Sequence, residues 1–433
     1  MAFYRFLIPG FLCMAFFVLV VKLSILQHAS SPSVTLSILQ HASSPSVTLS
    51  LRGAETAAAA GAARSVPDAL ALVVARPALP AALPPSFVVP RASSTFPTNA
   101  ASGRGRFVIV GSQEGWGSYV SVQYFTFFRT LRFAYAWEFV DGGSWAELAD
   151  NLLRDGNAAP AVLLFMESWH IVGWGAVDAR LRMGGSTIWF FTNDLHWFNE
   201  EVHANKVSVL SGDAVDVIVG AYMHLLPAMF PGAAGKPRLH SPHAVTPIFM
   251  LPLNGAPRMR VLLAGASSDV YPYRTRVKEK IAAGDARFEE LPHPGYHADL
   301  AAMKDAPNVG ANFARSLNGY VAVITDGLVF NYSVAKVFEI PACGSLLLAN
   351  SELVPVLADL GLYAGTHFLS YTFDSMDAVV DFVLDPANRG VVDAIRAEGQ
   401  ALVWARHTVF HRAAALDAAA RLFSKKSESP SIN

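Results

Sequence analysis

The stretch Lys336–Asn350 reads KVFEIPACGSLLLAN. A Glu stands two residues before a Pro, a Gly follows, and the next residues form an apolar run, Leu346–Ala349. This pattern predicts the first turns of a short helix, a tight turn at Gly344 and a buried parallel strand. A carboxylate on such a helix is costly to bury without partners, so we expect Glu339 to face a cleft.

Apolar runs that read as buried strands recur on both sides of this stretch, with helical patterns such as 145–154 and 270–284 between them. They fall into two sets separated by a Pro-containing connector at about 231–257: 107–111, 161–166, 186–194 and 215–221, then 260–266, 287–291, 320–326 and 366–371. Strands that alternate with helices predict a doubly wound parallel sheet. The restart predicts an α/β chain with two Rossmann-like domains, 106–255 and 256–422, each with its ligand crevice at the carboxyl ends of the strands.

The composition excludes several classes of protein. The chain has 433 residues, of which 52% are hydrophobic and 15% charged, so it can bury sizeable cores and is not a disordered chain. A net charge of −1 gives no basic field for nucleic acid. The two cysteines, Cys13 and Cys343, are not expected to pair, and no Cys/His metal spacing occurs. We therefore expect no nucleic-acid partner, no internal disulfide and no metal or other cofactor.

The N-terminal region predicts a membrane anchor and a stem. Residues 6–21 are apolar and uncharged, so 1–26 reads as an uncleaved signal anchor, with a cleaved signal peptide as the alternative. The unit LSILQHASSPSVT occurs at 23–35 and again at 36–48, and the region 27–105 is rich in Ala, Pro and Ser. Such a segment is typical of a stem that holds a globular region away from the bilayer. A polar tail, 423–433, ends the chain.

The stretch 336–350 resembles the donor-site motif of GT-B glycosyltransferases, in the form of the group-1-like family related to spore-coat-type transferases. The resemblance implies that Glu339 accepts hydrogen bonds from the ribose hydroxyls of a nucleotide sugar. It also implies that Lys336 meets the diphosphate and that Gly344 lets the backbone approach closely. Asn331 stands where many GT-B transferases carry a second Glu, so the chain departs from the family pattern there.

Two further motifs of the second half resemble the same family. In VYPYR, 270–274, the fork of Arg274 suits bidentate contact with a phosphate, and the alternative is a surface Arg at a helix start. In HPGY, 293–296, His293 either contacts the nucleotide or stabilises a Pro-Gly turn. No Asp-x-Asp pair occurs in the sequence. We therefore expect Lys336 and Arg274, rather than a metal ion, to neutralise the leaving diphosphate.

Polar and aromatic side chains follow two strands of the first half. One group is Asp194, His196 and Trp197, and the other is Glu167 and His170. Indole rings pack on sugar rings, and Asp or His can serve as a general base, so these side chains predict an acceptor site with Asp194 and His196 as catalytic candidates. The alternative is an aromatic core with capping Asp and His.

Two segments resemble the parts of the family that join its domains. The first, LHSPHAVTPIF at 239–249, carries His243, which lines the predicted acceptor cleft or stabilises a Pro-rich connector. The second, ARHTVFHR at 405–412, resembles the terminal helix that packs back across the domains, and we read it as structural.

The resemblance implies a glycosyltransferase, and together with the predicted signal anchor it leads us to expect a type II, single-pass membrane protein that faces the Golgi or ER lumen. It would move a sugar from a nucleotide-sugar donor to a hydroxyl of a glycan, protein or lipid, without a metal ion. Two alternatives remain: a non-catalytic glycan-binding membrane protein on the same fold, and a two-lobed ectodomain that binds a small solute.

Overall fold

The computed structural model describes residues 105–111, 122–140, 144–166, 177–196, 200–295 and 305–427. The predicted signal anchor, the tandem repeat and nearly all of the predicted stem lie outside these residues. Within the described ranges, no helix is both long and apolar enough to span a bilayer.

The first half contains a six-stranded parallel sheet in the order β2-β1-β3-β4-β5-β6. Its strands are β1 (Phe107–Val110), β2 (Glu138–Val140), β3 (Val162–Met166), β4 (Thr187–Thr192), β5 (Val217–Gly220) and β6 (Arg238–His240). The helices of this half are α3 (Val122–Ala134), α4 (Trp145–Leu152), α5 (Ala179–Met183), α6 (Glu200–Ser211) and α7 (Leu226–Met229).

The second half contains a five-stranded parallel sheet in the order β11-β10-β9-β7-β8. Its strands are β7 (Arg258–Ala264), β8 (Phe288–Leu291), β9 (Tyr320–Thr325), β10 (Leu346–Asn350) and β11 (Leu369–Tyr371). The helices that follow the connector are α8 (Pro272–Ala282), α9 (Gly310–Asn318), α10 (Lys336–Ala342), α11 (Val354–Asp359), α12 (Met376–Leu384), α13 (Arg389–Arg406) and α14 (Val409–Ser427). Two Rossmann-like parallel sheets confirm the predicted fold class.

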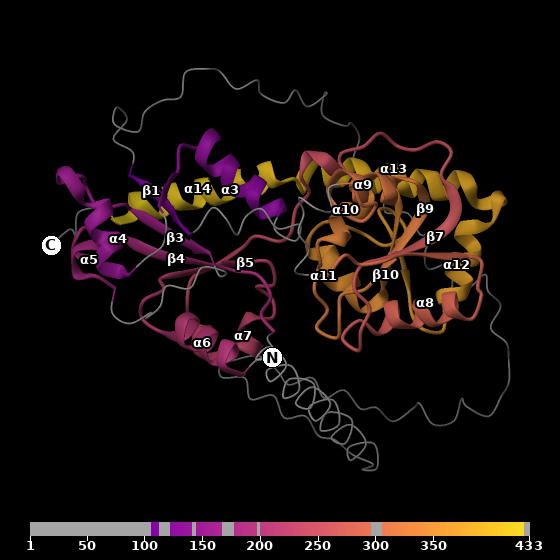
Figure 1. Cartoon of the computed structure of the whole chain (residues 1–433), viewed down its shortest axis with the longest axis horizontal. Coiled ribbons are helices and arrows are strands. Elements are labelled where there is room, and N and C mark those ends of the chain that lie inside the picture. The colour runs from indigo at the N-terminus through magenta and orange to yellow at the C-terminus, as the bar shows by residue number, and fades with distance from the viewer. Residues whose placement is uncertain are drawn as a thin grey trace, which may run out of the picture. The chain divides into compact units, whose positions relative to one another are not determined.

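Each sheet is covered on both faces, as a doubly wound fold requires. In β1, alternate side chains enter different apolar clusters: Val108 and Val110 pack with α4, whereas Phe107 and Ile109 pack with α3. In the second sheet, α8 and α12 contribute to the cluster on one face, and α9 and α10 contribute to the cluster on the other. Figure 1 shows α9 and α10 on the opposite side of β7, β9 and β10 from α8.

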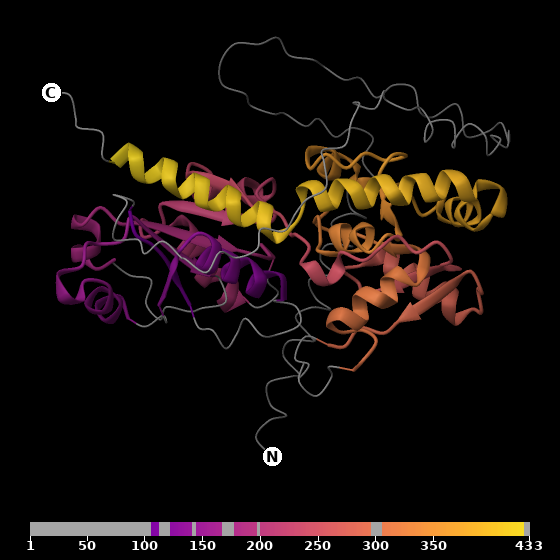
Figure 2. The ribbon, with the colours of Figure 1, turned by 90° about the horizontal axis from the view of Figure 1, so that it is seen from above.

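The C-terminal helix α14 packs on the first sheet although it follows the second in sequence. Val409, Ala413 and Leu416 belong to the same apolar cluster as α3 and β1. The indole Nε1 of Trp137 donates a hydrogen bond to Asp417 in α14 at 2.9 Å. Figure 2 shows this helix in yellow, at the end of the colour ramp. The segment 405–412 therefore begins a helix with the structural packing that its resemblance implied.

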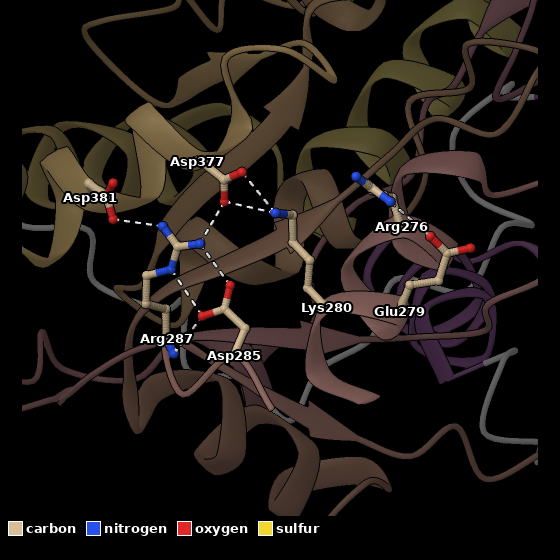
Figure 3. A network of polar contacts seen from close by, with 7 residues as sticks. All are labelled: Arg276, Glu279, Lys280, Asp285, Arg287, Asp377 and Asp381. Carbon is tan, nitrogen blue, oxygen red and sulfur yellow. Dashed lines mark hydrogen bonds and ion pairs between the residues drawn. The ribbon is translucent and has the colours of Figure 1, made fainter. Parts of the chain in front are cut away.

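A network of ion pairs ties the carboxyl end of α8 to α12 (Figure 3). The ammonium of Lys280 lies 2.8 Å from a carboxylate oxygen of Asp377. Arg287 donates to Asp377 at 2.6 Å, to Asp381 at 2.7 Å and to Asp285 at 2.7 Å. A shared network holds geometry better than isolated surface pairs, which contribute little each. It fixes the far end of the helix whose first turn carries Arg274.

Candidate donor site

The order of the second sheet defines one switch point, between β7 and β9. From β7 the chain continues to β8 on one side, and from β9 it continues to β10 on the other. Open α/β sheets hold their ligands outside the carboxyl ends of the strands at such a point. The segments that leave these two ends begin at Gly265 and Asp326, so they define where a ligand of this domain is expected.

Gly265 brings together two cations that lie far apart in sequence. A Cβ atom on this residue would lie 2.6 Å from Cε of Lys336 and 2.9 Å from Nη1 of Arg274. Gly265 also has a φ of +116°, which only glycine adopts without strain. The glycine therefore provides both the turn after β7 and the space in which the two side chains approach one another.

Lys336 and Glu339 stand in the first turn of α10, as the sequence predicted. Burial lowers the pKa of Lys336 to about 8; the carboxylate of Glu339 opposes this shift, and the charge of Arg274 adds to it. Burial also raises the pKa of Glu339, against the charge of Lys336. The ammonium of Lys336 lies 5.7 Å from the ring centroid of Phe313, within cation–π range. Two like charges on Lys336 and Arg274, held partly out of water, create a site that favours an anion.

Arg274 is buried and held by protein groups on most of its guanidinium. Its Nε lies 3.1 Å from Oδ1 of Asp326. Its Nη2 donates to Oγ1 of Thr325 at 2.8 Å and to the carbonyl of Asp326 at 3.1 Å, and its Nη1 donates to the carbonyl of Ala266 at 3.1 Å. The guanidinium also lies 4.1 Å from the ring centroid of Tyr271. Nη1, the atom nearest the position of a Cβ on Gly265, is the part of Arg274 that borders Lys336.

His293 lies within the electrostatic field of the same two cations. Its pKa falls to about 4, first because of burial and then because of the charges of Lys336 and Arg274. Its Nδ1 accepts a hydrogen bond from the N–H of Gly295 at 3.1 Å, which supports the predicted turn. His293 therefore lies near enough to Lys336 and Arg274 for their charges to act on its ring, and the nucleotide contact predicted for His293 stays a prediction.

Three polar groups at this switch point were not singled out from the sequence. The hydroxyls of Ser267 and Ser333 are buried, and neither has a hydrogen-bond partner among the described residues. Asp326 is buried, and its pKa is raised by burial against the opposing charge of Arg274. All three residues lie in the segments that follow β7 or β9. Asp194 was selected from the sequence because it follows a predicted strand, and the same criterion applied to these two strands would have selected them.

Asn331 and Gly344 lie near the two ends of α10. Asn331 has a φ of +56°, a left-handed conformation that Asn tolerates better than most residues. Gly344 has a φ of +77°, and a Cβ on it would lie 2.8 Å from Nε2 of Gln400 in α13. The predicted turn at Gly344 is confirmed, at the opposite end of α10 from Lys336. Donor-binding roles for these two residues stay predictions.

The acceptor candidates of the first half are only partly covered by the structure. Glu167, His170 and Trp197 lie outside the described residues. Asp194 follows β4 and is exposed, and its carbonyl accepts a hydrogen bond from the ammonium of Lys206. His196 is half-buried two residues later. The catalytic roles of Asp194 and His196 stay predictions.

His243 is held by a defined set of hydrogen bonds. The N–H of Ala244 donates to Oε1 of Gln123 at 3.2 Å, which turns the amide nitrogen of Gln123 toward Nδ1 of His243. Nε2 of His243 lies 2.7 Å from the hydroxyl of Tyr222. Because Nδ1 accepts from the amide, Nε2 carries the proton and donates to that hydroxyl.

The charge state of His243 follows from burial and nearby cations. Burial, then the charges of Lys336 and Arg412, lower its pKa to about 3, so the ring is neutral at physiological pH. A partly open pocket of about 20 Å³ lies beside it, which is room for a water molecule. The acceptor contact predicted for His243 stays a prediction.

Gly265→Ala tests the arrangement of the cations directly. We expect a fall in donor affinity of at least 10-fold, because the new methyl group occupies the space in which Lys336 and Arg274 meet. The free energy of unfolding should also fall, by about 1–3 kcal/mol, because a φ of +116° strains any residue with a Cβ and Nη1 of the firmly held Arg274 must shift. Calorimetric titration with UDP and GDP, together with denaturant unfolding, measures both effects. Normal affinity in a stably folded Gly265→Ala protein would contradict the assignment.

Comparison with known proteins adds independent information. A family model described as "Glycosyl transferase-like" matches residues 249–418. These residues form a glycosyltransferase-like domain. The match confirms the predicted class of enzyme, and it covers the switch point between β7 and β9 together with α10. Within the described ranges, no group of three or more His, Cys, Asp or Glu side chains could hold a metal ion.

No curated protein sequence matches the chain. Among solved structures, the HepE protein of Anabaena in complex with UDP is similar with a TM-score of 0.48 and 10% identity, over 73% of this chain and 99% of that one. A glycosyltransferase from Rickettsia africae has a TM-score of 0.44 and 8% identity, over 75% and 100% of the two chains. A GtfA/B complex has a TM-score of 0.39 and 11% identity, and the match covers 65% of this chain and only 61% of that one. Likenesses at this level do not assign any residue of the glycosyltransferase-like domain.

Proposed function

We propose that the protein transfers a sugar from a nucleotide-sugar donor to a hydroxyl of a glycan, protein or lipid, and that the second Rossmann-like domain holds the donor. The observation that supports this most directly is the pair of cations, Lys336 and Arg274, packed over Gly265 at the switch point. The negative charges of a nucleoside diphosphate can pair with both cations, and the hydroxyl of Ser267, which has no hydrogen-bond partner among the described residues, can donate to a phosphate oxygen.

In the proposed reaction, the cations act on the leaving group. Negative charge develops on the diphosphate as its bond to the sugar breaks, and preorganised positive groups stabilise that charge without reorganisation. Lys336 supplies a protonated ammonium and Arg274 supplies its Nη1 edge. Glu339, one turn along α10, accepts hydrogen bonds from the ribose hydroxyls. No metal ion is required in this scheme.

The acceptor side rests on sequence position alone. We propose that Asp194 or His196 removes the proton of the acceptor hydroxyl, because both follow β4 at the carboxyl edge of the first sheet. The proposed acceptor contacts are Glu167, His170, Trp197 and His243.

We also propose that the apolar segment 6–21 anchors the protein as a single-pass type II membrane protein, with the catalytic region in the Golgi or ER lumen. The relation to spore-coat-type transferases is likewise a proposal, which the motif at 336–350 supports.

Glu339→Gln is the variant that tests the donor site. We expect its affinity for UDP or GDP to fall about 10- to 100-fold, because a hydrogen bond to a charged group contributes about 1.5–3 kcal/mol. The 2′-deoxy nucleotide should bind wild type more weakly than the ribonucleotide, and this difference should be smaller in Glu339→Gln, whose neutral amide oxygen is a weaker acceptor than the carboxylate. Calorimetry on the purified full-length protein measures both ratios, and release of nucleotide from a panel of nucleotide sugars measures transfer.

Glu279→Gln is the matched control, because Glu279 is an exposed residue of α8 paired only with Arg276 among the contacts of the described residues. It makes the same change of charge and should leave binding unaltered. If wild type binds glycans but no nucleoside diphosphate, the protein is a glycan-binding protein on this fold and the proposal is wrong.

A further inference from the structure

The amino end of α8 is the helix terminus next to the switch point. Each backbone N–H group of its first turn already has a hydrogen-bond acceptor within the protein. Pro272, its first residue, has no N–H. The N–H groups of Tyr273 and Arg274 both donate to Oδ2 of Asp326, at 3.1 and 3.2 Å. The next N–H, of Thr275, is bonded within the helix to the carbonyl of Tyr271 at 3.0 Å. Helix amino ends commonly bind phosphate through such donors, and here a side-chain carboxylate occupies them.

The same carboxylate also sets the orientation of Arg274. Oδ1 of Asp326 lies 3.1 Å from Nε of Arg274, and the two side chains are 1% and 3% exposed. Oγ1 of Thr325, the residue before Asp326, accepts a hydrogen bond from Nη2 of Arg274 at 2.8 Å. Nε faces Asp326 as an ion pair without hydrogen-bond geometry, and Nη2 is hydrogen-bonded on the β9 side, so Nη1 is left at the edge of Gly265, where Lys336 also lies. Asp326 therefore determines which part of the guanidinium a ligand can meet.

Resting on the proposed function, we propose that Asp326 is a positioning residue for the donor diphosphate. Its carboxylate occupies the N–H groups at the amino end of α8, and so moves the diphosphate away from that helix terminus toward Lys336 and Nη1 of Arg274. The diphosphate is then recognised by side-chain cations rather than by backbone N–H groups of α8. Asp326 touches no part of the donor in this arrangement.

The proposal predicts an effect opposite to that of simple electrostatics. If Asp326 only reduced the positive charge of the site, Asp326→Asn would make the site more positive and tighten the binding of an anion. If Asp326 positions Arg274, the neutral amide loses the ion pair with Nε, and its single oxygen cannot serve both Nε and the N–H groups of Tyr273 and Arg274, so the guanidinium is held less firmly and binding weakens. The sign of the change therefore separates the two roles.

The experiment measures the binding of UDP, GDP and inorganic pyrophosphate to full-length wild type, Asp326→Asn and Asp326→Ala. We expect both variants to bind the preferred nucleoside diphosphate at least 10-fold more weakly. Added formate should restore binding to Asp326→Ala, because a small carboxylate can occupy the vacated place, and should have no effect on Asp326→Asn, where the amide fills it. Thermal unfolding identifies the variants that are folded. Unchanged or tighter binding by folded Asp326→Asn would overturn the proposal.

A buried Arg without its partner can prevent folding, so a milder variant is needed as a second test of the proposal. Thr325→Val keeps Asp326 and removes one of the two acceptors of Nη2, and we expect about 3- to 10-fold weaker binding. If neither Asp326 variant folds, normal binding by Thr325→Val overturns the proposal. If wild type itself binds no nucleoside diphosphate, the proposed function fails, whereas normal binding by both wild type and the folded variants removes only the role of Asp326.

Discussion

Lys336→Ala is expected to weaken the binding of UDP or GDP by about 100-fold, because truncating one partner of a charged, partly buried contact costs about 2–5 kcal/mol. Transfer from the corresponding nucleotide sugar should fall at least as much, since the same ammonium stabilises the leaving diphosphate. The stability of the fold should not decrease. Burial lowers the pKa of Lys336, so the folded protein holds this charge at a cost, and its removal leaves the melting temperature unchanged or higher.

Lys278→Ala is the matched control for this variant. Lys278 lies on α8, its side chain is 55% exposed, and it pairs with Glu290 at 3.1 Å. Lys278→Ala makes the same change of charge as Lys336→Ala. Its ion pair is with Glu290 and not with a residue of the donor site, so binding should be normal. Calorimetric titration and thermal unfolding of both variants provide the comparison. A Lys336→Ala protein that binds and transfers like Lys278→Ala would remove the central group from the donor site.

The local parts of the fold were predictable because they depend on neighbouring residues. In 336–350 the apolar pattern changes from helical to extended across one glycine, and α10, the turn at Gly344 and β10 follow that change. The strands β2 and β6 were missed for a physical reason. They are three-residue edge strands with half-buried or exposed side chains, so they have no apolar run to reveal them.

The site was predictable only where its residues lie within one turn of a helix. Lys336 and Glu339 share the first turn of α10, and their spacing indicates a common direction. That Arg274 meets Lys336 depends on β7 lying beside β9, which is a property of the strand order and not of either segment. The role of Asp326 depends on the same adjacency, because its carboxylate reaches a helix that precedes it by more than forty residues.

The departure at Asn331 also has a structural explanation. Its backbone is left-handed, with a φ of +56°, and the side chain of Asn suits that conformation better than that of Glu. The missing second carboxylate therefore follows from the shape of the segment before α10. It does not by itself favour a protein without catalytic activity.

The affinity for the donor is expected to depend on pH in a way that only Lys336 explains. Its pKa of about 8 in the free protein means that the ammonium is charged at pH 7 and loses its proton as the pH rises through 8. We expect the dissociation constant for UDP or GDP to be flat from pH 6.5 to 7.5 and then to rise. The rise approaches 10-fold per pH unit, until the pH reaches the higher pKa that Lys336 has beside a bound anion.

The two histidines near the site do not titrate in this range. The rings of His293 and His243, with pKa values of about 4 and 3, are neutral throughout. The last phosphate ionisation of a nucleotide lies near pH 6, so the ligand is fully charged above pH 7. The ammonium of Lys336, with its pKa of about 8, is the group that we expect to change the affinity as the pH rises above 7.5.

Lys336→Arg separates this explanation from a general loss of structure at high pH. The guanidinium of this variant stays protonated throughout, so its affinity should not change between pH 7.5 and 9.5. Because a guanidinium is larger than an ammonium, the variant should bind more weakly than wild type at pH 7. Calorimetry over that range, with circular dichroism to confirm folding, gives both profiles. Parallel declines in wild type and Lys336→Arg would mean that another group controls the affinity, whereas a decline in wild type alone identifies the ammonium over Gly265 as the cation that holds the diphosphate.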